Sequence, residues 1–359
     1  MQINRRKVVG SGVLAAGAFA VNRARAQSTT PARQSIKIGQ IGVGHAHATK
    51  LSVYRNSSDY EVVGICEPDP KLRQQAEKQP AFQGLPWMTE EQLLNTPGLQ
   101  AVVVETQVRD LLATAERCVA AGMHVHLDKP AGDSLPDYRR LLDQAQRQQL
   151  MVQMGYMYRY NPAVVLLREC LAKGWLGDVF EVHTVMSKVV PPASRQELAE
   201  FSGGMMFELG CHIIDLVVGV LGAPQQITAF GAHHSTTQAD ELRDNMLAVF
   251  QYPQALATVK TSAMEVNGFA RRHFVVCGSQ GTFHIQPLDN PTAIMTLAQP
   301  QGEYRAGAQE IQFPKFPRYV GDAADMAQVI RDEKESQFDY AHDWAVQSSV
   351  LAACQAGAS

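Results

Sequence analysis

The first half of the chain alternates apolar runs with segments whose apolar positions recur at helical spacing. Ile36–Ile41, Tyr60–Cys66, residues 100–104 and His124–Leu127 are almost continuously apolar, as is typical of strands buried on both faces of a parallel sheet. A helix is expected between the last two of these strands, where apolar residues recur every three or four positions. The alternation predicts an α/β fold with a doubly wound parallel sheet, which binds its ligand at the carboxyl ends of the strands.

The pattern changes after about Tyr156, where strand-like segments follow one another with turns between them and few helices. These segments are residues 178–189, 226–232, 246–252, 255–264, 272–277 and 282–286. Consecutive strands without crossover helices predict an α+β domain with a largely antiparallel sheet. One helix is expected over residues 205–221 and another at the carboxyl end, over residues 340–355.

The first 26 residues have the pattern of an export leader. Arg5, Arg6 and Lys7 precede a weakly apolar stretch, and Ala24-Arg25-Ala26 resembles a cleavage signal. The paired arginines fit a bacterial twin-arginine signal, although Val8 stands where phenylalanine is usual. The apolar stretch is too short to span about 30 Å of hydrocarbon. We therefore expect cleavage near Ala26 and a periplasmic or otherwise exported protein.

The composition excludes several classes of protein. With 45% hydrophobic residues, 19% charged residues and a net charge of −3, the chain resembles an ordinary globular protein and gives no sign of a nucleic-acid or anionic-membrane partner. The six cysteines form no CxxC pair, and most lie in apolar runs, so buried thiols are expected. Their spacing specifies no disulfide.

A glycine-rich turn follows the first strand directly. Gly42 and Gly44 separate that strand from a helix expected over residues 45–54, and Glu67 ends the second strand. A dinucleotide site requires this geometry: the glycines let a pyrophosphate approach the helix amino terminus, and the acid binds the adenosine ribose. The acid favours NAD over NADP, and His45 is placed to contact the pyrophosphate. Because His47 replaces the third glycine, an ordinary glycine-rich turn remains the alternative.

Two further groups of polar residues are candidates for chemistry. Lys129 follows the strand that ends at Leu127, so it can reach both a nicotinamide ribose and a substrate, although a surface lysine is the alternative. Glu208, His212 and Asp215 are spaced so that all three share one face of an otherwise apolar helix. Ionisable groups on a buried helix need partners or a wet cavity, and a solvated face is the alternative.

Three motifs in this order resemble a known family. They are the strand–GxG–helix opening, Asp128-Lys129-Pro130, and residues 203–215 with the pattern GG-x3-[DE]-x-G-x-H-x2-D. Together they resemble the glucose–fructose oxidoreductase, inositol dehydrogenase and MocA-like family (Gfo/Idh/MocA) over about residues 36–353. The resemblance implies a Rossmann domain over residues 35–155, a substrate domain over residues 156–335 and a final helix that returns to the Rossmann domain.

The resemblance also implies roles for individual residues. Lys129 corresponds to a lysine that contacts nicotinamide and substrate, and His212 to the acid/base for the reacting hydroxyl. Glu208 stands where the family usually has aspartate, assisting that histidine or binding the sugar. Arg159 and Asp215 are expected to line the substrate cleft.

Several positions depart from the family pattern, and all lie near the expected cofactor. Asp128 replaces glutamate before the lysine, and Glu105 is an unexpected acid beside the nicotinamide pocket. Thr106 is retained as a cofactor contact, but Gln107 and Leu111 replace the family's proline and histidine. NAD binding is therefore expected, with NADP less favoured.

We therefore expect an exported oxidoreductase that transfers a hydride to or from a sugar, polyol or glycoside through tightly bound NAD. A cofactor that cannot exchange must be restored in each turnover, either by a second substrate or by transient oxidation coupled to glycoside cleavage. The alternatives are a non-catalytic carbohydrate-binding protein and a dehydrogenase without a leader.

Three expectations concern partners. The twin-arginine export machinery is one, and the family's use of the open sheet face for dimerisation allows a homo-oligomer. No metal is expected, because the pairs His45/His47 and His124/His126 lack a third ligand at a familiar spacing.

Overall fold

The computed structural model describes residues 34–355, so the predicted leader and its cleavage point lie outside the described residues. The first sheet of this part has the strand order β3-β2-β1-β4-β5-β6, and all its pairings are parallel. Its strands are β1 (Ile36–Ile41), β2 (Tyr60–Cys66), β3 (Trp87–Met88), β4 (Leu99–Val104), β5 (His124–Leu127) and β6 (Val152–Met154). The predicted doubly wound sheet is confirmed.

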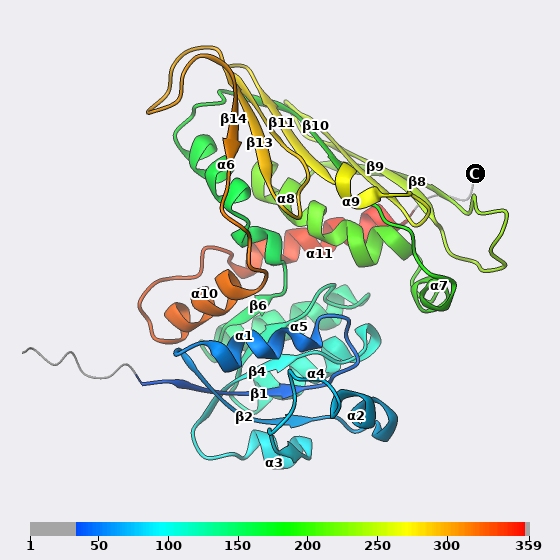
Figure 1. Cartoon of the computed structure of the whole chain (residues 1–359), viewed down its shortest axis with the longest axis vertical. Helices are drawn as coiled ribbons and strands as arrows, with labels where there is room; N and C mark the ends of the chain where they lie inside the picture. Colours follow the sequence, from blue (N-terminus) through cyan, green and yellow to red (C-terminus); the bar gives the residue numbers. More distant parts are fainter. Residues whose placement is uncertain (1–33, 356–359) are drawn as a thin grey trace, which may run out of the picture. The chain divides into compact units, whose positions relative to one another are not determined.

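Helices connect these strands, as the alternation predicted (Figure 1). They are α1 (Leu51–Asn56), α2 (Pro70–Ala76), α3 (Glu90–Leu94), α4 (Val108–Ala120) and α5 (Leu135–Arg147). The prediction that the first helix begins at His45 is wrong. A 3₁₀ turn over Ala48–Lys50 precedes α1, so His45 and His47 belong to the loop after β1. The directions of these two side chains are therefore not set by the geometry of a helix.

The second sheet has eight strands in the order β14-β13-β12-β11-β7-β10-β9-β8. They are β7 (Val179–Val185), β8 (Gln226–Ala232), β9 (Asn245–Gln251), β10 (Leu256–Ser262), β11 (His273–Gly278), β12 (Gly281–Ile285), β13 (Thr292–Leu297) and β14 (Gly307–Gln312). Only β7 and β10 pair in parallel, so the predicted, largely antiparallel sheet is confirmed. The prediction had omitted β13 and β14.

Helices cover one face of the second sheet (Figure 1). They include α6 (Pro162–Ala172) and α8 (Cys211–Leu221), whereas α7 (Pro192–Ala199), α9 (Gly268–Arg271) and α10 (Val320–Ile330) are connecting segments. Helix α11 (Tyr340–Cys354) contacts α8 and also α5 of the first sheet's layer. One apolar core includes Val104 and Leu127 as well as Ile214, Val350 and Phe250, so the two sheets share it.

The predicted helix over residues 205–221 is confirmed, but it is not α-helical throughout. Met206–Gly210 form a π-helical turn that continues directly into α8 at Cys211. A π turn adds a residue to the helical repeat and is frequent at functional sites. Because it shifts the register, Glu208 and Asp215 no longer share one face in the way that regular spacing predicted.

Two global properties complete the fold. Among residues 34–355, no helix combines the length and apolar character needed to cross a membrane. All six cysteines are free, and five of them are buried, in agreement with the prediction of buried thiols.

Candidate active site

The loop after β1 is built around Gly42. Its φ is +89°, and a Cβ atom there would lie 2.4 Å from the Thr106 amide nitrogen, so no other residue fits this position without strain. The next amide, that of Val43, donates to Glu67 Oε2 at 2.8 Å. The acid at the tip of β2 is thereby held beside the glycine turn, as a dinucleotide site requires.

Two adjoining clefts lie along this loop. One has a volume of about 360 Å³ and is lined by Glu67, Thr106 and Gln107, among others. The other has a volume of about 240 Å³ and runs from Gly44 and Gln107 to Glu208. Gln107 lines both clefts. The cofactor-binding residues predicted at Gly44, Glu67 and Thr106 thus border these two clefts, and the second cleft reaches Glu208 of the π turn.

Lys129 contacts Glu208, which lines the second cleft, and is almost completely buried. Its Nζ donates to Glu208 Oε1 at 3.0 Å and to the Glu208 carbonyl oxygen at 2.9 Å. Burial alone would lower the pKa of Lys129, but the Glu208 carboxylate outweighs burial and holds that pKa above its ordinary value. In the same pair, Lys129 overcomes burial and lowers the pKa of Glu208. The predicted surface-lysine alternative is wrong, and Lys129 remains charged.

His212 lies among aromatic rings close to this ion pair. The rings of Tyr158 and Tyr156 approach it edge-on with centroids 5.3 and 6.0 Å away, and the ring of His47 lies at 6.4 Å. Its Nδ1 is buried without a hydrogen-bond partner. Burial and the nearby Lys129 charge lower the pKa of His212 well below its ordinary value. His212 is therefore a neutral imidazole, ready to accept a proton.

The carboxylates of Glu208 and Asp215 both have partners other than His212. Glu208 pairs with Lys129. Asp215 forms a buried ion pair with Arg159, whose Nε and Nη2 both donate to it, the shorter bond at 2.6 Å. Asp343 also accepts from Arg159 Nη2, at 2.5 Å. Since these charges are satisfied internally, the structure does not support Arg159 and Asp215 as direct substrate ligands.

A second group of charges is buried near the loop, and sequence reasoning missed its lysine, Lys50. Lys50 Nζ lies 2.6 Å from Asp128 Oδ2 and 2.9 Å from Glu105 Oε1, and all three side chains are fully enclosed. The same nitrogen lies 3.0 Å from Nε2 of His126. Burial and the neighbouring Asp128 raise the pKa of Glu105 well above its ordinary value. The ammonium group of Lys50 is therefore shared between two buried carboxyl groups.

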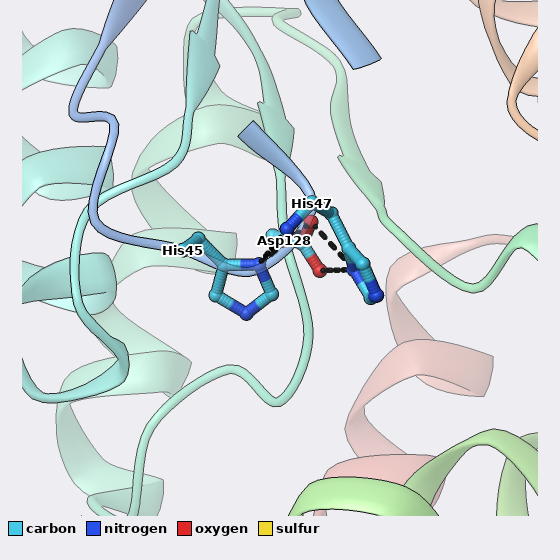
Figure 2. A group of neighbouring side chains, drawn as sticks. All are labelled: His45, His47 and Asp128. Atoms are coloured by element: carbon cyan, nitrogen blue, oxygen red, sulfur yellow. Dashed lines mark hydrogen bonds and ion pairs between the residues drawn. The ribbon is translucent and has the colours of Figure 1, made fainter. Parts of the chain in front are cut away.

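Asp128 also meets both histidines of the loop. Figure 2 shows its carboxylate between the rings of His45 and His47. His45 Nδ1 lies 3.2 Å from Oδ2, and His47 Nδ1 lies 3.2 Å from both carboxylate oxygens. Asp128 Oδ1 further accepts the Lys129 amide at 2.6 Å. Asp128 thus connects the loop to the lysine of the site.

This arrangement bears on two expectations for His45. The His45 amide donates to the Glu105 carbonyl oxygen at 3.0 Å, so that amide is not free to bind a phosphate. The ring borders the cleft, and its contact with a pyrophosphate stays a prediction. His45, His47 and Asp128 also bring three ligand atoms close enough for a metal ion. The ammonium group of Lys50 on the same carboxylate disfavours a second cation there.

Both halves of the chain match models of a known protein family. A model of the Gfo/Idh/MocA oxidoreductase family, NAD-binding Rossmann fold, matches residues 36–156. A model of the Gfo/Idh/MocA C-terminal domain matches residues 164–284.

Individual relatives are more distant. The chain is 27% identical over 233 residues to trans-1,2-dihydrobenzene-1,2-diol dehydrogenase of Bos taurus, covering 63% of this chain and 64% of that protein's length. It is 22% identical over 273 residues to myo-inositol 2-dehydrogenase of Thermotoga maritima, covering 74% and 79% of the two chains. A solved structure of the WlbA dehydrogenase from Bordetella pertussis, in complex with NADH and UDP-GlcNAcA, shares the fold with a TM-score of 0.71. It is 18% identical, and the alignment covers 89% of this chain and 95% of that one.

Proposed function

The chain belongs to the Gfo/Idh/MocA family of oxidoreductases, and we propose that it transfers a hydride between bound NAD and a secondary alcohol carbon of a sugar, polyol or glycoside. One observation carries the proposal: the buried Lys129 forms an ion pair with Glu208, which lines the cleft that extends from Gly44. A neutral His212 lies close by. The relatives named above are dehydrogenases of a dihydrodiol and of a cyclic polyol, which supports an alcohol substrate.

The residues around the glycine turn fit a dinucleotide. Gly42 can adopt the turn that brings the backbone close to a pyrophosphate, and Glu67 at the β2 tip can accept hydrogen bonds from ribose hydroxyls. The carboxylate favours NAD, because it would repel the 2′-phosphate of NADP. When bound, NAD supplies the acceptor and donor of the hydride, and the protein supplies position and electrostatics.

The protein's own groups then handle the hydroxyl proton. Because His212 is held neutral, it can accept that proton as the alcohol is oxidised and return it in the reverse direction. Lys129 is held charged by Glu208, so it can stabilise negative charge on the same oxygen. Tyr156 and Tyr158 pack against the His212 ring and restrict its orientation.

We further propose that the protein is exported and retains its cofactor. The Arg5-Arg6 leader supports export in a folded state, and an exported enzyme has little access to free nucleotide. Protein purified from the periplasm without added nucleotide should begin near Gln27. Denaturation should release about one equivalent of NAD(H) per chain and little NADP(H), measured by amino-terminal sequencing and an enzymatic nucleotide assay.

Different results would contradict export and hydride transfer. An intact leader on active cytoplasmic protein would contradict export but leave the oxidoreductase proposal in place. Protein that contains no nucleotide and binds none when NAD or NADP is added would contradict hydride transfer. The alternative of a carbohydrate-binding protein on the same scaffold would then be favoured.

The pH dependence of alcohol oxidation tests the state of His212. Its folded pKa is lowered by burial and by Lys129, so it stays neutral below pH 6.5, where a free imidazole would be protonated. We expect the acid limb of kcat/KM for oxidation to have its midpoint below pH 6.5. A midpoint at or above pH 6.5 would show that His212 does not act as a neutral base in this environment.

A further inference from the structure

Three departures from the family pattern meet in one place. His47 stands where the third glycine is expected, Glu105 is an extra acid, and Asp128 replaces glutamate before the lysine. In the structure they lie around Lys50, which contacts both acids, and Asp128 contacts His47. The chain therefore holds an imidazole beside the site where the pattern has no side chain.

His47 is oriented by Asp128. Its Nδ1 lies 3.2 Å from both carboxylate oxygens, which leaves Nε2 on the opposite edge of the ring (Figure 2). An imidazole held at Nδ1 by a buried carboxylate is the arrangement that directs Nε2 toward a substrate in Ser-His-Asp sites.

The His47 ring is less enclosed than the His45 ring. The His47 side chain is 19% exposed, whereas that of His45 is 4% exposed. The His47 ring lies 6.4 Å from the ring of His212 and 5.7 Å from that of Tyr319, between centroids. Two imidazoles from different elements thus lie near each other.

We propose that His47, held by Asp128, is a second acid/base group of this site, and that it moves the proton on the carbon next to the oxidised carbon. The proposal rests on the proposed function, since only oxidation of the alcohol makes that neighbouring proton acidic. His212 handles the hydroxyl proton, and His47 handles the carbon-bound one.

The step balances within the residues described. The proton leaves carbon for His47 Nε2, the C–H electron pair forms a C=C bond, and the carbonyl oxygen takes the negative charge beside the ammonium group of Lys129. Burial keeps the pKa of His47 at about 4 despite the nearby carboxylate, so the imidazole begins neutral. Asp128 then faces the imidazolium that forms.

This assignment identifies a class of substrate. Transfer of a hydride from one alcohol to the carbonyl group of another substrate does not require removal of a proton from carbon. Elimination does require removal of a carbon-bound proton, which forms an enolate. The enolate then expels an oxygen substituent from the next carbon: the C–O bond breaks, and the leaving oxygen departs with the electron pair. His47 therefore favours glycosides or polyol derivatives with an oxygen leaving group β to the oxidised carbon.

Deuterium exchange tests the proton transfer directly. NAD⁺-loaded protein is incubated in D₂O with 2-keto-myo-inositol and with dihydroxyacetone, and deuterium beside the carbonyl is measured by mass spectrometry. Heat-denatured protein gives the background. Loss of absorbance at 340 nm, with NADH-loaded protein and the same ketones, reports the hydride step separately.

His47→Gly is the variant of choice, because it restores the glycine of the family pattern and removes the imidazole. We expect exchange to fall by at least about 100-fold and the 340 nm rate by less than about tenfold. Added imidazole should restore exchange to the variant. Ala46→Gly, a glycine in the same loop that leaves the imidazole in place, should retain exchange. If His47→Gly does not fold, His47→Gln replaces it.

Several outcomes would overturn the assignment of His47. Wild-type protein that exchanges neither ketone above background would do so, and so would a variant that retains exchange or loses both rates equally. One equivalent of bound divalent metal, with exchange abolished by a chelator, would make the histidines metal ligands instead. Exchange without any change at 340 nm in the wild type would refute the proposed hydride transfer but leave the role of His47 intact.

Discussion

His212→Ala protein is expected to fold and to bind NAD, but to oxidise its alcohol about 10² to 10⁴ times more slowly than the wild type. The loss should appear in kcat, because the imidazole is needed to accept the hydroxyl proton. The fold should survive because His212 Nδ1 has no hydrogen-bond partner, so its removal leaves no polar atom unpaired at that position.

A matched histidine elsewhere provides the control. His183 is exposed on β7 of the second sheet, and His183→Ala should retain the wild-type rate. Circular dichroism and bound nucleotide content would confirm that both variants fold. Full activity of His212→Ala would remove this residue from the mechanism and move the acid/base role to a neighbour.

Lys50→Met should lower the free energy of unfolding by about 3 to 5 kcal/mol, the cost of leaving a buried ion without its partner. Lys50 contacts both Asp128 and Glu105, and all three side chains are fully enclosed. Burial opposes the charge on Lys50, yet the two carboxyl groups outweigh it and raise its pKa above the ordinary value. Urea denaturation of the nucleotide-free variant and wild type would measure the loss.

Two further variants separate charge balance from simple packing. Lys71 is exposed on α2, so Lys71→Met should change the free energy of unfolding by less than about 0.5 kcal/mol. Adding Asp128→Asn to Lys50→Met should recover part of the loss, because it removes the uncompensated anion. A double variant less stable than Lys50→Met would mean that Asp128 acts mainly through its bonds to His47 and the Lys129 amide.

Local patterns in the sequence were enough to predict most elements of the fold. The apolar runs of β1, β2, β4 and β5 fix strands buried on both faces, because a chain can bury such runs only inside a parallel sheet covered by helices. The GxG turn and Glu67 were also predictable, because their geometry depends on elements that are adjacent in the sequence. Lys129 and His212 were recognisable from motifs of fixed spacing.

Long-range contacts were not predictable in this way. Lys50 reads in the sequence as an ordinary helical lysine, and only packing across 78 positions brings it to Asp128. Arg159 and Asp215 carry the residue types of a substrate site, but the fold pairs them with each other and with Asp343. A short motif specifies which residue types are present, but it does not specify which side chains they contact in the folded chain.

The sequence alone therefore determined the parallel and antiparallel sheets, the glycine turn and the identity of the lysine and histidine, because periodicity and spacing act over a few residues. The tertiary structure decided their partners. It placed a π turn in the helix at Met206–Gly210, where Glu208 pairs with Lys129. It also placed His47 beside His212. It brought Lys50 to Asp128, because a buried charge needs a counterion and only the packed chain supplies one.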